Sequence, residues 1–276
     1  MIDIQNQTDH RDIPLQKVGI RGLSYPVQVL DKAKETQQTS AKVDLFVNLP
    51  KHFKGTHMSR FIEIFHKYHK DLSMPRFLAM LEEIRIRLEA EQAFGTLIFP
   101  FFLEKKAPVS KQTSIMSYEC TYEGSVGTNN RSFYVSVVVP ITTVCPCSKA
   151  ISQRGAHNQR GTVKVKIRSS VFFWIEDIIN LVEDSASASL YSLLKRSDEK
   201  FVTEQAYDNP RFVEDVVREI YLELRNFRCK DSLKSEQKNE GQPIKWFSIE
   251  AENFESIHNH NAYAYTEYDA DLEEKI

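Results

Sequence analysis

The sequence lacks a long apolar segment, an excess of basic residues and a large set of cysteines. Its most apolar stretch, residues 95–103, is interrupted by Pro100, whereas a membrane-spanning helix needs about 20 apolar residues. Residues 1–15 are polar and contain no apolar core of the kind found in secretory signals. We therefore expect a soluble, cytoplasmic protein with no membrane partner.

The charges of the chain nearly cancel. Lys and Arg number 36 and Asp and Glu 38, which gives a formal net charge of -2. Proteins that bind nucleic acid more often carry a basic excess, so no nucleic-acid partner is expected and any positive site must be local.

Cysteine is scarce but partly clustered. The four residues are Cys120, Cys145, Cys147 and Cys229, too few for a disulfide scaffold in a chain of this size. In a cytosolic protein, closely spaced cysteines indicate a metal site or a reactive thiol before a disulfide.

Hydrophobic periodicity predicts strands and helices in a repeating order. Alternating patterns predict strands over 18–30, 42–48, 96–103, 113–122, 132–144, 162–168, 245–251 and 257–265. Helical spacing predicts helices from Met58, from Ser73, over 172–182, over 185–196 and after the pair Asn209-Pro210, which we interpret as a cap and first turn. Residues 124–130 are typical of a turn, and 230–243 of a polar loop.

The order strand, strand, helix, helix, strand, strand thus occurs about twice. Antiparallel pairs with helices on one face define an α+β fold. We predict two units, 1–128 and 129–276, with the boundary near 127–131 and the chemistry in the second.

The densest chemical segment combines Cys145-Pro146-Cys147-Ser148-Lys149 with Gly155-Ala156-His157-Asn158-Gln159-Arg160, between two predicted strands. Cysteine sulfur and imidazole nitrogen are both ligands for borderline metals such as zinc. One cysteine, one histidine and a carboxylate would leave a coordination position open for water, as a hydrolytic metal requires. Ordinary buried cysteines are the alternative interpretation.

Three further segments are candidates. Phe254-Glu255-Ser256-Ile257-His258-Asn259-His260 places two histidines on one face of a predicted strand, with Glu255 on the other; a polar strand end is the alternative. Lys54, His57 and Arg60 surround a predicted helix start, either an anion site or a capped helix entry. Lys149, Arg154 and Arg160 form a basic patch, either for a phosphate group or merely solvated.

Together these segments resemble the GTP cyclohydrolase I enzymes of type IB. The resemblance rests on Cys-Pro-Cys-Ser-Lys with Gly-Ala-His-Asn-Gln-Arg, on Phe-Lys-Gly-Thr-His-Met-Ser-Arg-Phe, on Asp198-Glu199-Lys200 with Thr203-Glu204-Gln205-Ala206-Tyr207 and Asn209-Pro210, and on Phe-Glu-Ser-Ile-His-Asn-His. It extends from about Val18 to Tyr265.

The resemblance implies a tunnelling fold (T-fold) with two tandem ββααββ units. In this family sheets from several subunits complete a barrel, with active sites at the subunit interfaces. A homodimer or homotetramer is the corresponding expectation.

The resemblance also implies a hydrolase reaction in which GTP and water give 7,8-dihydroneopterin triphosphate and formate, the first step of de novo folate synthesis. Cys145 and His157 match the family's metal ligands and Glu199 the third, with Glu204 as the alternative. Cys147 is expected beside the metal, although the choice between the two cysteines stays open. The metal is zinc, manganese or iron.

Further roles follow from the same resemblance. His258 and His260 are candidates for proton transfer, and Glu255 for binding the two adjacent N–H donors of guanine. Glu214 matches a second family site position. Lys54, His57, Arg60, Lys149, Arg154 and Arg160 are candidates for the triphosphate.

Two other functions remain open from the sequence. One is a T-fold nitrile reductase of queuosine synthesis, which uses a cysteine nucleophile and NADPH. The other is a module that binds metal or purine without catalysis.

Overall fold

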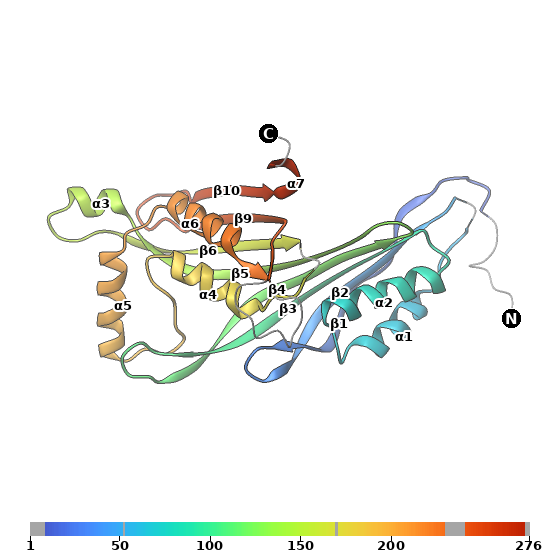
Figure 1. The fold of residues 1–276 in the computed structure, drawn as a ribbon, viewed down its shortest axis with the longest axis horizontal. Coiled ribbons are helices and arrows are strands. Elements are labelled where there is room, and N and C mark those ends of the chain that lie inside the picture. Colours follow the sequence, from blue (N-terminus) through green and yellow to red (C-terminus); the bar gives the residue numbers. More distant parts are fainter. Residues whose placement is uncertain (1–8, 52, 169–170, 230–240, 274–276) are drawn as a thin grey trace. The chain divides into compact units, whose positions relative to one another are not determined.

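A computed structural model of the chain describes residues 9–51, 53–168, 171–229 and 241–273 (Figure 1). The strands are β1 (Leu15–Asp31), β2 (Glu35–Leu49), β3 (Gln92–Lys106), β4 (Thr113–Gly127), β5 (Arg131–Val144), β6 (Asn158–Arg168), β7 (Arg228–Cys229), β8 (Gln242–Pro243), β9 (Trp246–Asn253) and β10 (Ala262–Asp269). The helices are α1 (Met58–Tyr68), α2 (Met74–Arg87), α3 (Pro146–Ile151), α4 (Ile175–Ser185), α5 (Arg196–Asp208), α6 (Val213–Asn226) and α7 (Ala270–Glu273).

The chain divides into two compact units that share the three strands β3, β4 and β5. Unit 1 comprises Met1–Pro100 with Thr121–Val135, and unit 2 comprises Phe101–Cys120 with Ser136–Ile276. This is a division by contacts, whereas the repeat boundary near 127–131 is one of sequence pattern and stays a prediction.

Unit 1 packs two helices on a sheet with the strand order β1-β2-β3-β4-β5. The pairs β1–β2 and β2–β3 are antiparallel. Alternation in β2 buries Val43, Leu45 and Val47, as the sequence pattern predicts. α1 and α2 lie side by side (Figure 1), and α2 approaches β3 closely because a Cβ at Gly95 would lie 2.8 Å from Leu81 Cδ2.

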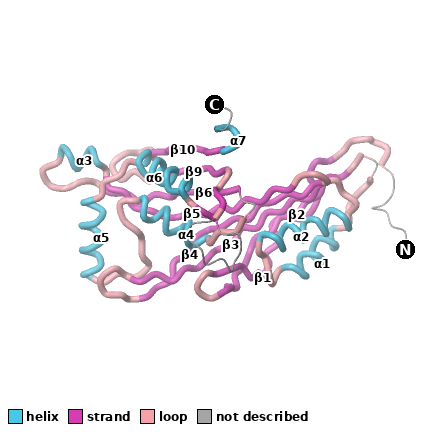
Figure 2. The backbone as a smooth tube through the Cα atoms, viewed as in Figure 1, coloured by secondary structure: helices cyan, strands magenta, loops and turns pink. Residues whose placement is uncertain are grey.

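Unit 2 has the strand order β3-β4-β5-β6-β9-β10, and its pairs β6–β9 and β9–β10 are antiparallel. The buried face of β6 and β9 consists of Val163, Val165, Ile167, Phe247, Ile249 and Ala251. The helices α4 and α6 pack side by side, and α6 contacts β9 and β10 (Figure 2). The element order confirms the predicted pattern in unit 1, where two helices stand between strand pairs, and differs from it in unit 2, where the three helices α4, α5 and α6 stand between β6 and β9 and the short α3 lies between β5 and β6.

Some predicted elements are wrong. No helix covers 186–195, because Ser187 and Ala188 pair with β5 through Ser187 N–H to the Thr142 carbonyl (3.1 Å) and an isolated bridge between Thr142 and Ala188. This tertiary pairing overrides the local helical spacing. The helix that follows, α5, starts only at Arg196.

Two boundaries also differ from the prediction. The pair Asn209-Pro210 does not start a helix: Asn209 is the C-cap of α5, and α6 begins after Phe212. Residues 124–127 belong to β4, so the turn is confined to 128–130. The predicted polar loop at 230–243 lies mostly outside the described residues, apart from the short strand β8.

Within the described part of the chain, no helix has the length and apolarity needed to cross a membrane. The cytoplasmic location stays a prediction.

Candidate active site

Four chain segments of unit 2 meet at a cavity of about 260 Å³. They are the end of β5, the start of β6, the loop between β9 and β10, and the start of α6. The lining residues are Cys145, His157, Gln159, Arg211, Phe212, Val213, Glu214, Asn253, Glu255, His258, His260 and Ala262. Six of the residues selected from the sequence, namely Cys145, His157, Glu214, Glu255, His258 and His260, are thus brought together.

Cys145 and His157 are held on opposite sides of the β5–β6 connection. The Cys145 N–H donates to the His157 carbonyl (3.1 Å), which pairs the two backbones directly. The Ser148 hydroxyl donates to the Cys145 carbonyl (3.1 Å) and accepts from the His157 N–H (3.2 Å). The Ser148 N–H donates to Cys145 Sγ (3.4 Å) at the start of α3. The local sequence therefore fixes the backbone at both residues and the side chain of Cys145.

The imidazole of His157 is oriented by a buried amide. His157 Nδ1 lies 3.0 Å from Gln159 Oε1, and Gln159 Nε2 donates to the Thr143 hydroxyl (3.0 Å). An amide oxygen only accepts, so this contact favours the tautomer in which Nδ1 carries the proton. Nε2 is then the nitrogen with a lone pair, as a metal-binding histidine requires.

The four cysteines are all free thiols, and they differ in burial. Cys120 and Cys229 are buried, and burial, with lesser contributions from Glu176 and Glu119, raises the pKa of the Cys120 thiol far above its usual value. Cys147 is exposed and does not line the cavity, whereas Cys145 does. Of the two cysteines left open by the sequence, Cys145 is therefore the one in position to bind a ligand.

His258 and His260 lie in a loop and not on a strand. β9 ends at Asn253 and β10 begins at Ala262, so the predicted strand from 257 and its shared face are wrong. The two rings nevertheless stack at 5.2 Å between centroids, and both line the cavity with Glu255. The loop is tied to β6, because Phe254 N–H donates to the Arg160 carbonyl (2.8 Å) and Ser256 Oγ lies 3.4 Å from His157 Nδ1.

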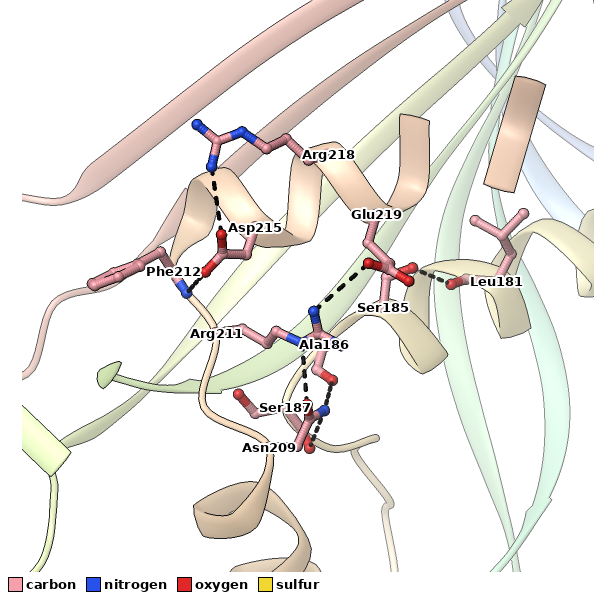
Figure 3. Close-up of polar contacts among 10 residues, drawn as sticks. All are labelled: Leu181, Ser185, Ala186, Ser187, Asn209, Arg211, Phe212, Asp215, Arg218 and Glu219. Atoms are coloured by element: carbon pink, nitrogen blue, oxygen red, sulfur yellow. Dashed lines mark hydrogen bonds and ion pairs between the residues drawn. The ribbon is translucent and has the colours of Figure 1, made fainter. Parts of the chain in front are cut away.

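The start of α6 contributes Glu214 and a cation that sequence reasoning missed, Arg211. Arg211 Nε donates to Asn209 Oδ1 (3.1 Å), and its guanidinium lies 3.7 Å from Glu219 Oε2 (Figure 3). Asn209 in turn donates to the Ala186 carbonyl (3.0 Å), and the Arg211 N–H to the Val144 carbonyl (3.0 Å). Arg211 directly follows the motif residues Asn209-Pro210. This adjacency is the feature of the sequence by which Arg211 could have been selected.

Asn253 is a second lining residue that the sequence analysis did not select. It is 2% exposed, and its Oδ1 has no hydrogen-bond partner among the described residues. The alternation of β9 could have revealed it. Phe247, Ile249 and Ala251 occupy alternate buried positions, and the next position on the same face is this polar asparagine.

Other selected residues of unit 2 do not line this cavity. Glu199 is exposed in the first turn of α5, and Glu204 is exposed and 3.8 Å from Lys200. Lys149 Nζ donates to the Tyr207 carbonyl and lies 4.3 Å from the Tyr207 ring centroid. Arg154 and Arg160 are exposed.

The remaining candidates, Lys54, His57 and Arg60, belong to unit 1. His57 is the N-cap residue of α1, without a side-chain cap bond. The Arg60 guanidinium donates to the Arg87 carbonyl at the end of α2 (3.1 Å). This contact joins the start of α1 to the end of α2.

A divalent metal fits the donors partly. A thiol and an imidazole with a free Nε2 share one cavity, which suits zinc, iron or manganese. Across the described ranges, no group of three or more His, Cys, Asp or Glu side chains is arranged to hold a metal ion. Two donors of the kind that bind such metals thus share the cavity, without a third beside them among the described residues.

This arrangement combines a pair of metal-type ligands with two carboxylates and a stacked pair of imidazoles. Carboxylates accept paired N–H donors, and imidazoles exchange protons near neutral pH. Such a set suits the hydrolysis of a small polar heterocycle.

Comparison with solved structures identifies the fold. Uricase from Arthrobacter globiformis matches with a TM-score of 0.51 and 7% identity, covering 92% of this chain and 93% of that one. Urate oxidase from Bacillus subtilis 168 matches with a TM-score of 0.51 and 8% identity, covering 93% and 99%. At this identity the likeness shows the fold alone, and it agrees with the expected T-fold.

Comparison of sequences identifies the family. Residues 1–264 match the family described as type I GTP cyclohydrolase FolE2, and the chain belongs to it. A relative named GTP cyclohydrolase FolE2 from Syntrophus aciditrophicus (strain SB) is 55% identical over 267 residues, which cover 97% of this chain and 99% of that protein. Proteins of the same name from Syntrophotalea carbinolica and Geobacter sulfurreducens are each 48% identical, covering 97% and 98% of this chain and 95% and 98% of theirs.

Proposed function

We propose that the protein is a GTP cyclohydrolase that converts GTP and water into 7,8-dihydroneopterin triphosphate and formate, in folate biosynthesis. Family membership over nearly the whole chain supports this reaction. The observation that carries it is the single cavity that Cys145, His157, Glu255 and His258 share.

Cys145 and His157 would hold a divalent metal, zinc, manganese or iron. When bound, such a metal lowers the pKa of a coordinated water and supplies a nucleophile near neutral pH. The chain's own contribution is the fixed orientation of both ligands, through Ser148 and Gln159.

Glu199 is our proposal for the third ligand, and the packing of α5 supports it over Glu204. Val202 and Ala206 of α5 pack in a small apolar cluster with Val144 and Ala156, the immediate neighbours of Cys145 and His157. Glu199 precedes Val202 by three residues and Ala206 by seven, so it shares their face of the helix. Glu204 lies about 140° around the helix from Glu199.

Glu255 would bind the guanine base. Its carboxylate lies in the cavity wall and can accept the two adjacent N–H donors of guanine in a charge-assisted pair. This contact would orient the imidazole ring of the base toward Cys145 and His157.

His258 and His260 would transfer protons during ring opening and the later rearrangement of the ribose. Their stacked rings lie in the same wall as Glu255, and imidazole is well matched to proton transfer near neutral pH. Glu214, at the start of α6, is a further candidate for a substrate contact.

The triphosphate needs cations. Arg211 lines the cavity, and Lys149, Arg154 and Arg160 are carried by α3, β6 and their connection. Arg211 is an additional candidate for binding the phosphates, beside the candidates from the sequence, which are Lys149, Arg154 and Arg160 with Lys54, His57 and Arg60 of unit 1.

We further propose a homo-oligomer, dimer or tetramer, in which sheets from several chains are joined. β10 ends the strand order of unit 2, and it exposes Tyr263 (59%) and Tyr265 (52%). Beside it, residues of α6 and β10 line a cavity of about 540 Å³ with a largely apolar wall. Mass measurement in solution tests this assembly.

The reaction is tested by a GTP assay on chelator-treated protein, with manganese, zinc or iron added back separately. Release of formate, together with pterin fluorescence after oxidation, is expected only with metal. Folded protein that yields neither product with any metal would contradict the proposal. NADPH oxidation with a cyano-deazaguanine substrate would then favour the nitrile reductase, and stoichiometric GTP binding without formate a binding module.

A further inference from the structure

Asn253 occupies a core position at the edge of the cavity. It is the last residue of β9 and follows Phe247, Ile249 and Ala251 on the buried face of the strand. It pairs with Gly161 of β6 on one side and with Ala262 of β10 on the other. A polar side chain at this position thus departs from the apolar pattern of the face.

The Asn253 side chain carries a buried acceptor that no described residue satisfies. Its Oδ1 is withdrawn from solvent and has no hydrogen-bond partner. An unpaired polar atom of this kind destabilises a fold, and native structures contain few of them. Groups that remain unsatisfied in the free protein are therefore expected where a ligand completes the bonding.

Gly161 makes the room that this amide occupies. A Cβ at position 161 would lie 2.7 Å from Asn253 Oδ1 and 2.5 Å from the Glu252 carbonyl. The missing side chain on β6 and the polar side chain on β9 are thus complementary. The asparagine torsion χ2 is broad and roughly two-fold, so rotation about it exchanges the two ends of the amide and presents the oxygen to the cavity that Asn253 lines.

We propose that Asn253 Oδ1 accepts a hydrogen bond from bound GTP, given by a ribose hydroxyl or by the exocyclic amine of guanine. The inference rests on the proposed function and assigns one more substrate contact to the same cavity. A neutral acceptor suits these donors, because the cavity already holds the carboxylates of Glu214 and Glu255. Asn253 thereby contributes to specificity for the donors that distinguish GTP from its analogues.

The test uses the variant Asn253→Leu, which has nearly the same shape and no polar atom. Because the substitution removes an unsatisfied polar group, the urea midpoint of the metal-loaded protein should stay unchanged or rise. At the same time kcat/KM for formate release from GTP should fall about tenfold or more, mainly through KM. Asn180→Leu, on the exposed face of α4, is the matched control and should change neither quantity.

Substrate analogues identify the donor. Wild-type and variant enzymes are compared on GTP, 2′-deoxy-GTP, 3′-deoxy-GTP and inosine triphosphate, with formate release as the common readout. With the wild-type enzyme, kcat/KM for the analogue that lacks the donor to Asn253 should be about tenfold or more below kcat/KM for GTP. With Asn253→Leu, kcat/KM for that analogue should be nearly the same as for GTP. The other two analogues should lose the same factor with both enzymes.

The outcomes separate the contact from a structural role. Unchanged kcat/KM for GTP in Asn253→Leu, or losses that are additive for all three analogues, would overturn the proposal. If the leucine variant does not fold, Asn253→Ala provides the same comparison. Absence of formate release by the wild-type enzyme with every metal would instead contradict the proposed function itself.

Discussion

Two sets of buried polar groups in unit 2 differ in how completely they are satisfied. Around Glu183, Lys105 Nζ donates to the carboxylate at 2.6 Å and to the Leu190 carbonyl at 2.7 Å, and the Tyr118 hydroxyl donates at 2.7 Å. Burial foremost, and the neighbouring Glu183 charge, raise the pKa of Tyr118 far above its usual value. The donors and acceptors of this network are thus paired with one another within the chain.

The cavity has the opposite character. Asn253 Oδ1 is buried without a partner among the described residues, and Cys145 and His157 have metal-type donor atoms but no third ligand beside them. A complete network stabilises the fold and leaves nothing for a ligand to bind. An incomplete one is less stable alone and can be completed by binding, which supports our proposal that this cavity is the active site.

Removal of a metal ligand should have the largest effect on function. Cys145→Ala and His157→Ala should each lose bound metal and more than about a hundredfold in formate release, because even changes beside a metal ligand typically cost 10–100-fold. Far-UV circular dichroism should remain that of the wild type. Metal content and formate release check the result, with Cys147→Ala as the exposed control. Full turnover by either variant would remove the metal-ligand assignment.

Breaking the complete network should act on stability instead. Lys105→Met leaves the buried Glu183 carboxylate without its cation, since the two side chains are only 11% and 5% exposed. We expect a loss of about 3 kcal/mol in the free energy of unfolding, with little change in turnover of the folded enzyme. Urea unfolding measures it. Lys106→Met, exposed on the next position of β3, is the control. Equal midpoints for the two variants would contradict the prediction.

A smaller functional effect should separate Glu199 from Glu204. Glu199→Gln should weaken metal binding by about tenfold or more, because the amide is a poorer ligand than the carboxylate. Glu204→Gln removes only an exposed pair with Lys200 and should leave metal affinity unchanged. Titration of the stripped proteins with manganese distinguishes them, and equal affinities would argue against Glu199.

Local patterns were sufficient for most of the sheet and for the cavity's main chemical groups. Period-two alternation located β2, β5 and β6, and short motifs selected Cys145, His157 and Glu255. The failures arose where distant contacts decide the structure. Residues 186–188 have helical spacing but pair with β5. The histidines at 258 and 260 lie in a bend, which neither strand nor helix periodicity predicts.

The start of α5 shows the same limit. Asp198-Glu199-Lys200 was selected by its resemblance to a family motif, and the structure shows that Glu199 is exposed while Asp198 is fully buried. The Asp198 carboxylate accepts from the N–H groups of Val109 and Ser110 (2.8 Å each), the Ser110 hydroxyl (2.6 Å) and the Lys195 N–H (2.9 Å). These donors come from residues up to 89 positions away, so sequence spacing could not reveal them.

The Asp198 carboxylate, like that of Glu183, is therefore satisfied by donors within the chain. Its contribution to the free energy of unfolding should depend on pH. Burial opposes its charge, but the hydrogen bonds from Ser110, Lys195 and Val109 outweigh burial and hold the pKa of Asp198 well below its usual value. A lowered pKa contributes stability above the value of the unfolded chain, about 3.9, and this contribution is lost as the pH falls toward the folded-state pKa. Asp198→Asn should thus be less stable than the wild type by a constant amount from pH 8 to about pH 5, with the difference shrinking below about pH 4. Urea midpoints across this range test it. A difference that persists unchanged at about pH 3 would mean that Asp198 stabilises α5 through shape and not through its charge.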